Sequence, residues 1–380
     1  MHILIAPNAF KHSLTANEAA DAIQEGLRRS GLNFTSERFP IADGGDGTGH
    51  LIVEKCKGIW HEYDVHDPLG RLIKAPLGII DQGKTAVIEM ADASGIRLLE
   101  HHELSPLNAS SFGTGELIRH ALDRGVERMI IGLGGSATVD GGVGILSALG
   151  VKFLDQQGNS LDALPKNLNS LHALDLTEID QRIMNCQIKV LCDVDNLLLG
   201  TDGAAAVFGP QKGAGPEEVL MLDSVLSKLS DCVFRLNGRK MDQIVHGGAA
   251  GGVSASLSAI LNAELLNGAE HFLELTGFFE SLKSADLLIT GEGSLDEQTL
   301  QGKGPFAVAK YARAKGIPVL GLAGKVPLQD SSEMHEYFNV LLAIGNQPQD
   351  LESAMKFTAS NLIRTAKASG SLIAMFGSGN

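Results

Sequence analysis

Three clusters of glycines and acidic residues could hold a phosphate-bearing ligand, and each follows a short β-branched run. They are Ala42–Thr48, Gly132–Gly142 and Gly291–Asp296. Glycines let a backbone approach a phosphate closely, and neighbouring carboxylates are ligands that suit a hard cation such as Mg²⁺. Loops at the carboxyl ends of strands line the ligand crevice of an open parallel sheet. The sequence therefore predicts a Mg²⁺-nucleotide site built from several such loops.

A lysine and two aspartates are the residues that we expect to act on a phosphoryl group. Lys11 and Ser13 follow the first predicted strand, and Asp43 and Asp46 follow the second. Lysine together with carboxylates is the minimum equipment for moving a phosphoryl group. If the two strands pair, their ends lie roughly 5 Å apart. Lys11 and Ser13 should then face Asp43 and Asp46 across one rim.

The elements that must position these residues form a βαβ unit in the first forty residues. Residues 3–6 and 34–40 are the predicted strands. A capping box at Thr15 and Glu18 opens the helix between them, and Gly31 ends it. A right-handed crossover makes the two strands parallel, so that their loops meet at the same edge.

The second glycine cluster is compatible with two kinds of phosphate-binding loop. Gly132-x-Gly134-x-x-Ala137 follows a predicted strand and is similar to a dinucleotide fingerprint. That interpretation would place Gly141, Gly142 and Gly144 inside a helix, at about 1 kcal/mol each. A longer loop for nucleotide phosphates fits the glycine count better, while an NAD site and a purely structural loop remain alternatives. The nucleotide-binding residues that we expect are Gly134, Gly135, Ser136, Thr138 and Gly141.

Several charged loop residues are open to both a functional and a structural interpretation. Asp193 and Asp195 follow the strand-like run 188–191 and would either bind Mg²⁺ or form a turn. Lys212 and Lys303 lie beside glycines and would either reach a phosphate or remain solvated.

The segment Gly78–Thr85 matches the Walker A pattern. The P-loop mechanism requires a helix amino terminus directly after the lysine. Residues 85–89 are instead typical of a strand, so we interpret the segment as a β-hairpin.

The composition excludes several functional classes. The 380 residues are 44% hydrophobic and 20% charged, as in ordinary globular proteins, and this length predicts two domains. The formal charge of −14 argues against binding to nucleic acid or anionic membranes. The four separated cysteines indicate neither a zinc site nor a disulfide framework. We find no signal peptide and no apolar stretch of about eighteen residues, and therefore expect a cytoplasmic protein.

The order of predicted elements favours the α/β class, with a Rossmann-like doubly wound parallel sheet and a second, inserted α/β mixed-sheet domain. In the last third, strands alternate with helices; the strands are expected at 286–290, 317–322 and 338–344, and the helices at 305–315 and 351–367. Residues from about 59 to 90 show strand-like runs with short turns. We assign 1–58 and 276–380 to the Rossmann-like domain, with 112–145 as an optional part, and 59–275 to the inserted domain.

Taken together, the motifs resemble the bacterial glycerate kinase type-1 family. The matching stretches, which run in family order over nearly the whole chain, are Ala6–Leu14, Ala42–Thr48, Phe112–Leu117, Gly134–Gly142, Cys192–Asn196, Val207–Gly213 and Gly291–Thr299. The sequence departs from the commoner family pattern at Asn8 and Ala9 (often Asp-Ser), His12 (often Gly), Asp46 (often Glu) and Val139 (often Asn).

The resemblance implies ATP-dependent phosphorylation of D-glycerate, giving 2-phosphoglycerate, with Mg²⁺. On this basis we expect catalytic roles for Lys11, Asp43 and Asp193, and substrate binding by Ser13, Lys303 and Lys212. The metal ligands that we expect are Asp46, Asp195 and Glu292.

Three alternatives stay open at this point. One is an NAD-dependent oxidoreductase acting on a small hydroxy acid, another is phosphorylation at the 3-hydroxyl, and the last is a non-catalytic sensor. We expect small-molecule partners, glycerate and ATP, and neither nucleic acid nor a membrane. The oligomeric state is left open, a homodimer being one alternative.

Overall fold

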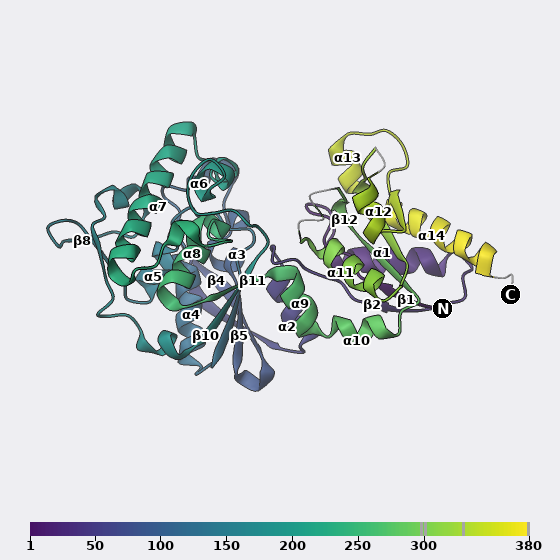
Figure 1. Cartoon of the computed structure of the whole chain (residues 1–380), viewed down its shortest axis with the longest axis horizontal. Helices are drawn as coiled ribbons and strands as arrows, with labels where there is room; N and C mark the ends of the chain where they lie inside the picture. Colours follow the sequence, from purple (N-terminus) through teal and green to yellow (C-terminus); the bar gives the residue numbers. More distant parts are fainter. Residues whose placement is uncertain (297–298, 300–301, 329–330, 378–380) are drawn as a thin grey trace. The chain divides into compact units, whose positions relative to one another are not determined.

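The computed structural model describes residues 1–296, 299, 302–328 and 331–377. The chain divides into two compact units (Figure 1). Unit 1 comprises Met1–Asp43 and Ala269–Asn380, and unit 2 comprises Gly44–Gly268. Glu297 and Gln298, which belong to the last stretch of the family resemblance, lie outside the described residues.

Unit 1 is built on a parallel sheet, which in the described residues has the strand order β14-β13-β12-β1-β2. The strands are β1 (His2–Ile5), β2 (Thr35–Arg38), β12 (Leu287–Ser294), β13 (Val319–Lys325) and β14 (Val340–Ala343). The helices are α1 (Ala16–Arg28), α9 (Gly268–Thr276), α10 (Phe278–Lys283), α11 (Gly304–Ala314), α12 (Ser332–Tyr337), α13 (Leu351–Lys356) and α14 (Thr358–Gly377). The helix α1 packs along α14 (Figure 1).

The order of these strands reverses between β1 and β12. From β1 the chain moves outward to β2, and after the excursion through unit 2 it returns to β12 on the other side of β1. Ligands of open α/β sheets bind outside the carboxyl ends of the strands at such a reversal. The loops after β1 and β12 are therefore the natural binding loops of unit 1.

Unit 2 contains a mixed sheet with the order β11-β10-β6-β5-β4-β3, in which β3 and β4 run antiparallel to their neighbours, and a small antiparallel sheet β8-β7-β9. The strands are β3 (Ile59–His66), β4 (Leu72–Ile80), β5 (Thr85–Glu89), β6 (Arg128–Gly132), β7 (Lys152–Leu154), β8 (Ser160–Leu161), β9 (Ala173–Asp175), β10 (Gln187–Cys192) and β11 (Glu264–Asn267). The helices are α2 (Thr48–Lys55), α3 (Met90–Ser94), α4 (Phe112–Asp123), α5 (Val143–Ala148), α6 (Ala204–Phe208), α7 (Pro216–Asn237) and α8 (Ala249–Leu261).

The unit boundaries differ from those predicted from the sequence. Unit 1 ends at Asp43 rather than at residue 58, because α2 packs on β4, β5 and β6 of the mixed sheet. Residues 112–145 belong to unit 2, since they supply α4 and the strand β6 at the centre of its sheet. The second boundary falls after Gly268 rather than after residue 275.

Several local predictions are confirmed. Thr15 and Glu18 form the reciprocal capping box of α1. The Walker A-like segment is the turn between the antiparallel strands β4 and β5, as the hairpin interpretation required. The predicted helix at 351–367 is instead two helices, α13 and α14, which are separated at Phe357.

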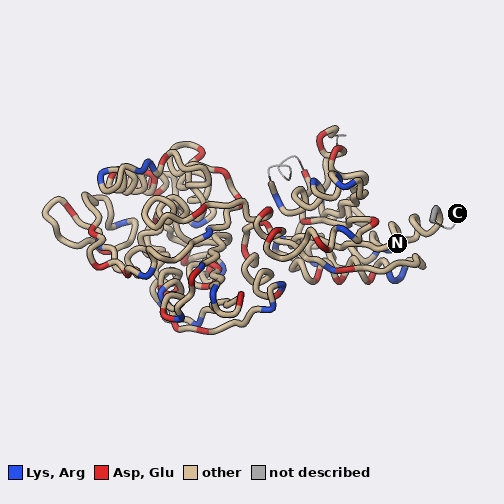
Figure 2. Tube along the Cα trace, turned by 60° about the horizontal axis from the view of Figure 1, so that its bottom comes forward, with Lys and Arg blue, Asp and Glu red and all other residues tan. Residues whose placement is uncertain are grey.

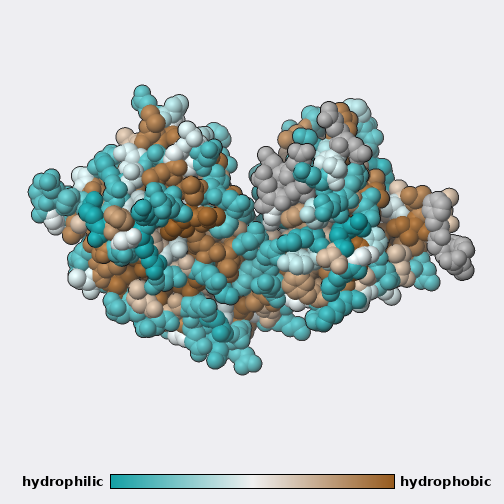
Figure 3. Space-filling model, in the orientation of Figure 1, coloured by the Kyte–Doolittle hydropathy of each residue, from teal (hydrophilic) through white to brown (hydrophobic). Residues whose placement is uncertain are grey.

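Charged residues of both signs and hydrophobic residues are spread over the described parts of the chain in the views of Figures 2 and 3. Lys and Arg are interspersed with Asp and Glu along the chain (Figure 2). Hydrophilic residues cover much of the face in Figure 3, broken by smaller hydrophobic areas. Among the described residues, no helix is both long and apolar enough to span a membrane.

Candidate functional site

The carboxyl ends of β1 and β2 bring two of the predicted loops together in unit 1. The Ile41 N–H donates to the Pro7 carbonyl at 3.0 Å. The Asn8 side chain donates from Nδ2 to Asp43 Oδ2 at 2.9 Å, and its Oδ1 accepts the Ala9 N–H. The loop that carries Lys11 and the loop that carries Asp43 are therefore neighbours on one edge, as the βαβ pattern predicts.

Glu292, near the end of β12, joins this edge. Its side chain is buried, and its Oε1 accepts a hydrogen bond from Thr299 Oγ1 at 3.2 Å. The pKa of Glu292 is raised to about 7, chiefly by burial and also by the charge of Asp43, while Lys303 and Lys11 act in the opposite direction. Two carboxylates and two lysines thus act on one another at this edge.

Lys303 is the N-cap residue of α11, and its half-buried side chain belongs to the same group. Gly304 follows it, and a Cβ there would lie 3.5 Å from Asn8 Nδ2. The amino terminus of α11 therefore packs beside the loop after β1. We call Asn8, Lys11, Asp43, Glu292 and Lys303 the edge cluster of unit 1.

Ser13, predicted to bind substrate, forms a hydrogen bond within unit 1. Its hydroxyl donates to the backbone carbonyl of Met355 in α13 at 2.6 Å. The hydroxyl proton is therefore used to tie the loop after β1 to α13.

The carboxyl edge of the mixed sheet in unit 2 gathers three other loops. Gly44 has φ = +97°, and a Cβ there would lie 3.3 Å from the backbone of Cys192 and 3.2 Å from Gly268. Gly134 is in closer contact, because a Cβ there would lie 2.2 Å from the Asp46 backbone nitrogen. The loop Gly44–Thr48 is thus packed against the chain that leaves β6, β10 and β11, and only glycine fits at these approaches.

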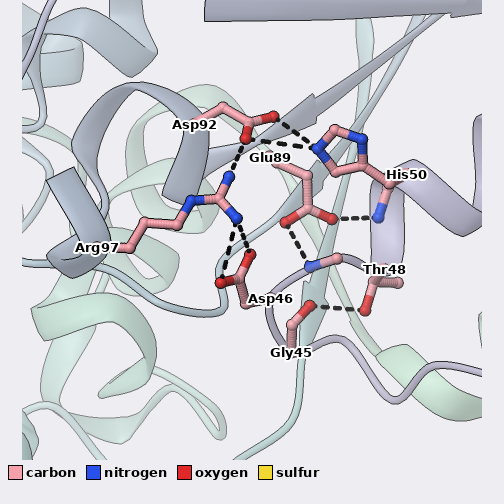
Figure 4. Close-up of polar contacts among 9 residues, drawn as sticks. Gly45, Asp46, Thr48, His50, Glu89, Asp92 and Arg97 are labelled. Carbon is pink, nitrogen blue, oxygen red and sulfur yellow. Dashed lines mark hydrogen bonds and ion pairs between the residues drawn. The ribbon is translucent and has the colours of Figure 1, made fainter. Parts of the chain in front are cut away.

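A polar network holds the loop Gly44–Thr48 and the start of α2 in place (Figure 4). The Arg97 guanidinium donates to Asp46 Oδ1 at 3.1 Å and also to Asp92. His50 Nε2 lies 3.1 Å from Asp92 Oδ2, and this hydrogen bond raises the pKa of His50. Asp46, predicted as a metal ligand, is therefore paired with Arg97 within unit 2.

Glu89 lies beneath the same loop. It ends β5, is fully buried, and accepts hydrogen bonds from the backbone N–H groups of Gly47 and Gly49 at the start of α2 (Figure 4). Burial raises the pKa of Glu89 to about 8, and the charges of Asp92 and Asp46 act in the same direction. The N-cap residue of α2, Gly47, has no side chain, so Glu89 supplies the missing cap from a distant part of the sequence.

The glycine loop, which we define as Gly132–Gly142, is divided into two halves by its hydrogen bonds. In the second half, the buried Asp140 accepts from the N–H groups of Ser111, Gly142 and Gly144, and also from the Ser111 hydroxyl. The Gly141 N–H donates to the Gly251 carbonyl at 2.9 Å. Gly141, predicted to bind nucleotide, therefore has its N–H group already engaged.

The first half of the glycine loop contains an exposed residue. Gly135 is exposed and has φ = +70°, whereas Ser136 and Thr138 are buried. The dinucleotide interpretation requires the helix after such a loop to offer its N-terminal N–H groups to the pyrophosphate. Here Asp140 already accepts from the N–H groups at the start of α5, which argues against that interpretation.

Lys212 lies under the glycine loop rather than on a solvated surface. Its side chain is 3% exposed, and its Nζ donates to Ser136 Oγ at 2.8 Å and to the Thr138 carbonyl at 2.7 Å. Burial lowers the pKa of Lys212 to about 7, while Asp140 raises it. The 3₁₀ turn Pro210–Lys212 places the side chain there, and Gly213 follows with φ = +98°.

The remaining predicted acids, Asp193 and Asp195, belong to unit 2. Asp193 and Asp195 follow β10 in unit 2, and both are exposed. Asp195 Oδ1 lies 3.0 Å from His246 Nδ1. Of the expected metal ligands, Asp46 and Asp195 belong to unit 2 and Glu292 to unit 1. Within the described ranges, no three Asp, Glu, His or Cys side chains form a group that could hold a metal ion.

Known proteins similar to this chain point to one family. The family described as the glycerate kinase family matches residues 3–374. The chain belongs to the glycerate kinase family. This confirms the resemblance found in the sequence and the expectation of a kinase.

Individual members of the glycerate kinase family match over most of their length. A glycerate kinase of Bacillus subtilis (strain 168) is 42% identical, over 97% of this chain and 96% of the relative. A protein named glycerate 2-kinase from Escherichia coli (strain K12) is 39% identical, over 97% of this chain and 96% of the relative. A crystal structure from Salmonella typhimurium LT2, named as a glycerate kinase 2, covers 100% of this chain and 99% of its own, with a TM-score of 0.84 and 40% identity.

For this member of the glycerate kinase family, sequence reasoning missed the network of Glu89, Asp92, Arg97 and His50. One signal was available, because Glu89 is the last residue of the run Thr85–Glu89, which was identified as a strand. An acid that ends a buried strand lies at the edge where ligands bind. The pairing of Arg97 with Asp46 could not be inferred locally, since the two residues lie 51 positions apart.

Proposed function

We propose that this kinase transfers the terminal phosphoryl group of ATP to D-glycerate and forms 2-phosphoglycerate. The observation that carries the proposal is the edge cluster of unit 1, where Lys11 and Lys303 act electrostatically on the buried carboxylate of Glu292 beside Asp43. Positioned cations and carboxylates supply most of the catalysis in phosphoryl transfer. The strand order of the parallel sheet supports the placement, because the cluster lies at the strand reversal.

Within the edge cluster, each residue has a proposed role. Lys11, which is exposed in the loop after β1, and Lys303, at the start of α11, would neutralise charge on the transferring phosphoryl group. Asp43 would accept the proton of the attacking hydroxyl or orient that hydroxyl. The hydrogen bond from Asn8 fixes one oxygen of the Asp43 carboxylate for this task. Asp193 stays a prediction of the sequence, without a place in this scheme.

The donor set of the edge cluster suits Mg²⁺. Asp43 and Glu292 are neighbouring carboxylates, and their mutual repulsion contributes to the raised pKa of Glu292. A divalent cation would relieve this repulsion, and Mg²⁺ is commonly held by one or two carboxylates plus phosphate oxygens. When bound, the ion would neutralise phosphate charge. We do not assign Asp46 and Asp195 to the metal, because Arg97 and His246 already pair with them.

In unit 2, we propose that the first half of the glycine loop binds the phosphates of ATP. Gly135 is exposed with a positive φ, a conformation in which glycine exposes its backbone to a ligand. Gly134 and Ser136 flank it. The glycine loop lies at the carboxyl end of β6, which is where ligands of parallel strands bind.

Phosphorus NMR of the reaction product tests this function. The protein is incubated with Mg²⁺-ATP and D-glycerate, and omission of glycerate is the control. We expect ADP and the resonance of 2-phosphoglycerate. The name of the Escherichia coli relative supports phosphorylation at the 2-hydroxyl. Formation of 3-phosphoglycerate would overturn the regiochemistry alone, whereas absence of any phosphoglycerate would overturn the proposal.

A further inference from the structure

Lys212 is a buried lysine whose hydrogen-bond partners all belong to the glycine loop. Among the described residues, its Nζ has two acceptors, Ser136 Oγ and the Thr138 carbonyl. An ammonium group has three N–H donors, whereas a neutral amine has two and a lone pair. The two acceptors therefore match the donor count of the neutral amine, and a third donor would be buried without a partner.

The surroundings of Lys212 favour the same protonation state. The side chain is 3% exposed, and burial penalises a charged amine. Asp140 is the charged group of the described chain whose field acts on Lys212 in favour of the ammonium form. Its carboxylate, however, is occupied by N–H groups of Ser111, Gly142 and Gly144. It forms no ion pair with Lys212 among the described residues, which leaves the amine without a direct counter-charge.

The exposed residue of the glycine loop is next in sequence to a residue that Lys212 contacts. Gly135, which we propose for phosphate binding, directly precedes Ser136, the residue whose hydroxyl accepts from Lys212. Thr138, on the same stretch, has a fully buried Oγ1 with no hydrogen-bond partner in the described chain. A phosphate bound at Gly135 would place negative charge close to the amine across a poorly solvated layer of backbone. Such a charge favours the ammonium form.

We propose that Lys212 is a positioning residue that holds the glycine loop as a neutral amine and takes up one proton from solvent when a nucleotide phosphate binds at Gly135. The inference rests on the proposed function of the glycine loop. Lys212 does not contact the nucleotide in this arrangement. It holds the loop in place through its hydrogen bonds to Ser136 and Thr138. The positive charge that it gains with the proton then attracts the phosphate.

Isothermal titration calorimetry of the whole protein with Mg²⁺-ATP, without glycerate, tests this linkage. Titrations in buffers of different ionisation enthalpy give the number of protons taken up. The lowered pKa of Lys212, about 7, sets the pH values: we expect uptake of close to one proton at pH 8.5 and much less at pH 6, where the amine is already charged.

The matched variant is K212R, because arginine retains N–H donors but stays charged throughout this range. We expect K212R to lose the proton uptake at pH 8.5, and this comparison also cancels protons exchanged by the nucleotide or by histidines. K212M, which lacks donors, should lose the uptake and bind Mg²⁺-ATP about tenfold more weakly, as expected when one charge-assisted interaction is removed.

The outcomes separate the inference from the function. Equal proton uptake in wild type and K212R, with normal binding, would overturn the role of Lys212 and leave the proposed nucleotide site intact. Failure of Mg²⁺-ATP to bind the wild type would overturn the nucleotide site, and the inference with it. If neither variant folds, carbon NMR of lysines labelled at Cε still decides: no lysine of the free wild type titrating near pH 7 would also overturn the inference.

Discussion

The two units use charge differently at equivalent places, the carboxyl ends of their parallel strands. In unit 1, Lys11 and Lys303 form no ion pair within the described residues, and they face the carboxylates of the edge cluster through their electrostatic field. In unit 2, the Arg97 guanidinium is paired with Asp46 and Asp92, and these ion pairs hold the loop Gly44–Thr48. We infer that the charges of the edge cluster in unit 1 act on the ligand, whereas the Arg97 ion pairs in unit 2 hold the loops in place. Substitutions should therefore separate into losses of activity and losses of stability.

The largest effect is expected from Lys11→Met in unit 1. The variant removes a cation that would stabilise developing charge in the transition state, and one such group is typically worth about 10²–10³-fold in kcat. Because Lys11 is exposed and forms no described ion pair, the free energy of unfolding should change little. Glycerate-dependent ADP release and urea denaturation measure the two quantities.

The matched control for Lys11→Met is Lys240→Met, which removes an exposed lysine of unit 2 outside both loop clusters. It should change neither kcat nor stability. Full glycerate-dependent turnover by Lys11→Met would refute the catalytic assignment of this lysine, and loss of folding would refute the division of roles between the units.

A loss of stability, rather than a direct catalytic loss, is expected from Arg97→Met in unit 2. The variant leaves Asp92, whose side chain is 4% exposed, without its guanidinium partner. Breaking a fully buried ion pair lowers the free energy of unfolding by about 3–5 kcal/mol. Because the Arg97 side chain is 46% exposed, we expect a smaller decrease of about 2 kcal/mol. Urea denaturation measures the change.

Arg182→Met is the control for Arg97→Met, since Arg182 also bridges two aspartates, Asp123 and Asp180, but does so at the surface. Arg182→Met should lower the free energy of unfolding by less than about 1 kcal/mol. Equal costs for the two variants would mean that the Arg97 network is no more than a surface feature.

The difference between the two units also bears on which features could be predicted from the sequence. The capping box of α1, the hairpin at Gly78–Thr85 and the meeting of the loops after β1 and β2 depend on neighbours in sequence or on a single crossover. Their determinants are local, so that propensity and turn chemistry were sufficient.

The loop supports of unit 2 could not be predicted in this way. Lys212 meets Ser136 across 76 residues, and Asp140 meets Ser111 across 29. A buried lysine and a solvated one look alike in a sequence, because burial is decided by packing between distant segments. The hydrogen bond of Ser13 could not be predicted for the same reason, since its acceptor in α13 lies 342 residues away.

Glu89→Gln tests the comparison between the charges of the two units. The quantity measured is the pH dependence of the free energy of unfolding. The pKa of Glu89 rises from an ordinary 4.5 to about 8 in the folded protein. Between these values the native state holds a proton that the unfolded chain has released. The contribution of Glu89 to stability is therefore complete below pH 4.5 and declines as pH rises toward 8, by about 1.4 kcal/mol per pH unit.

Glutamine mimics the protonated carboxyl, and its amide oxygen can still accept from Gly47 or Gly49 at the start of α2. The variant should thus resemble wild type below neutral pH and become relatively more stable as pH rises. Taking the difference between the two proteins in urea denaturation cancels the opposite trend of Lys212. Glu62→Gln, at an exposed position of β3, should run parallel to wild type at every pH. If the free energy of unfolding of Glu89→Gln also ran parallel to that of wild type at every pH, the buried carboxyl would titrate normally. An ionised carboxylate would then be tolerated under the loops of unit 2 as readily as at the edge of unit 1.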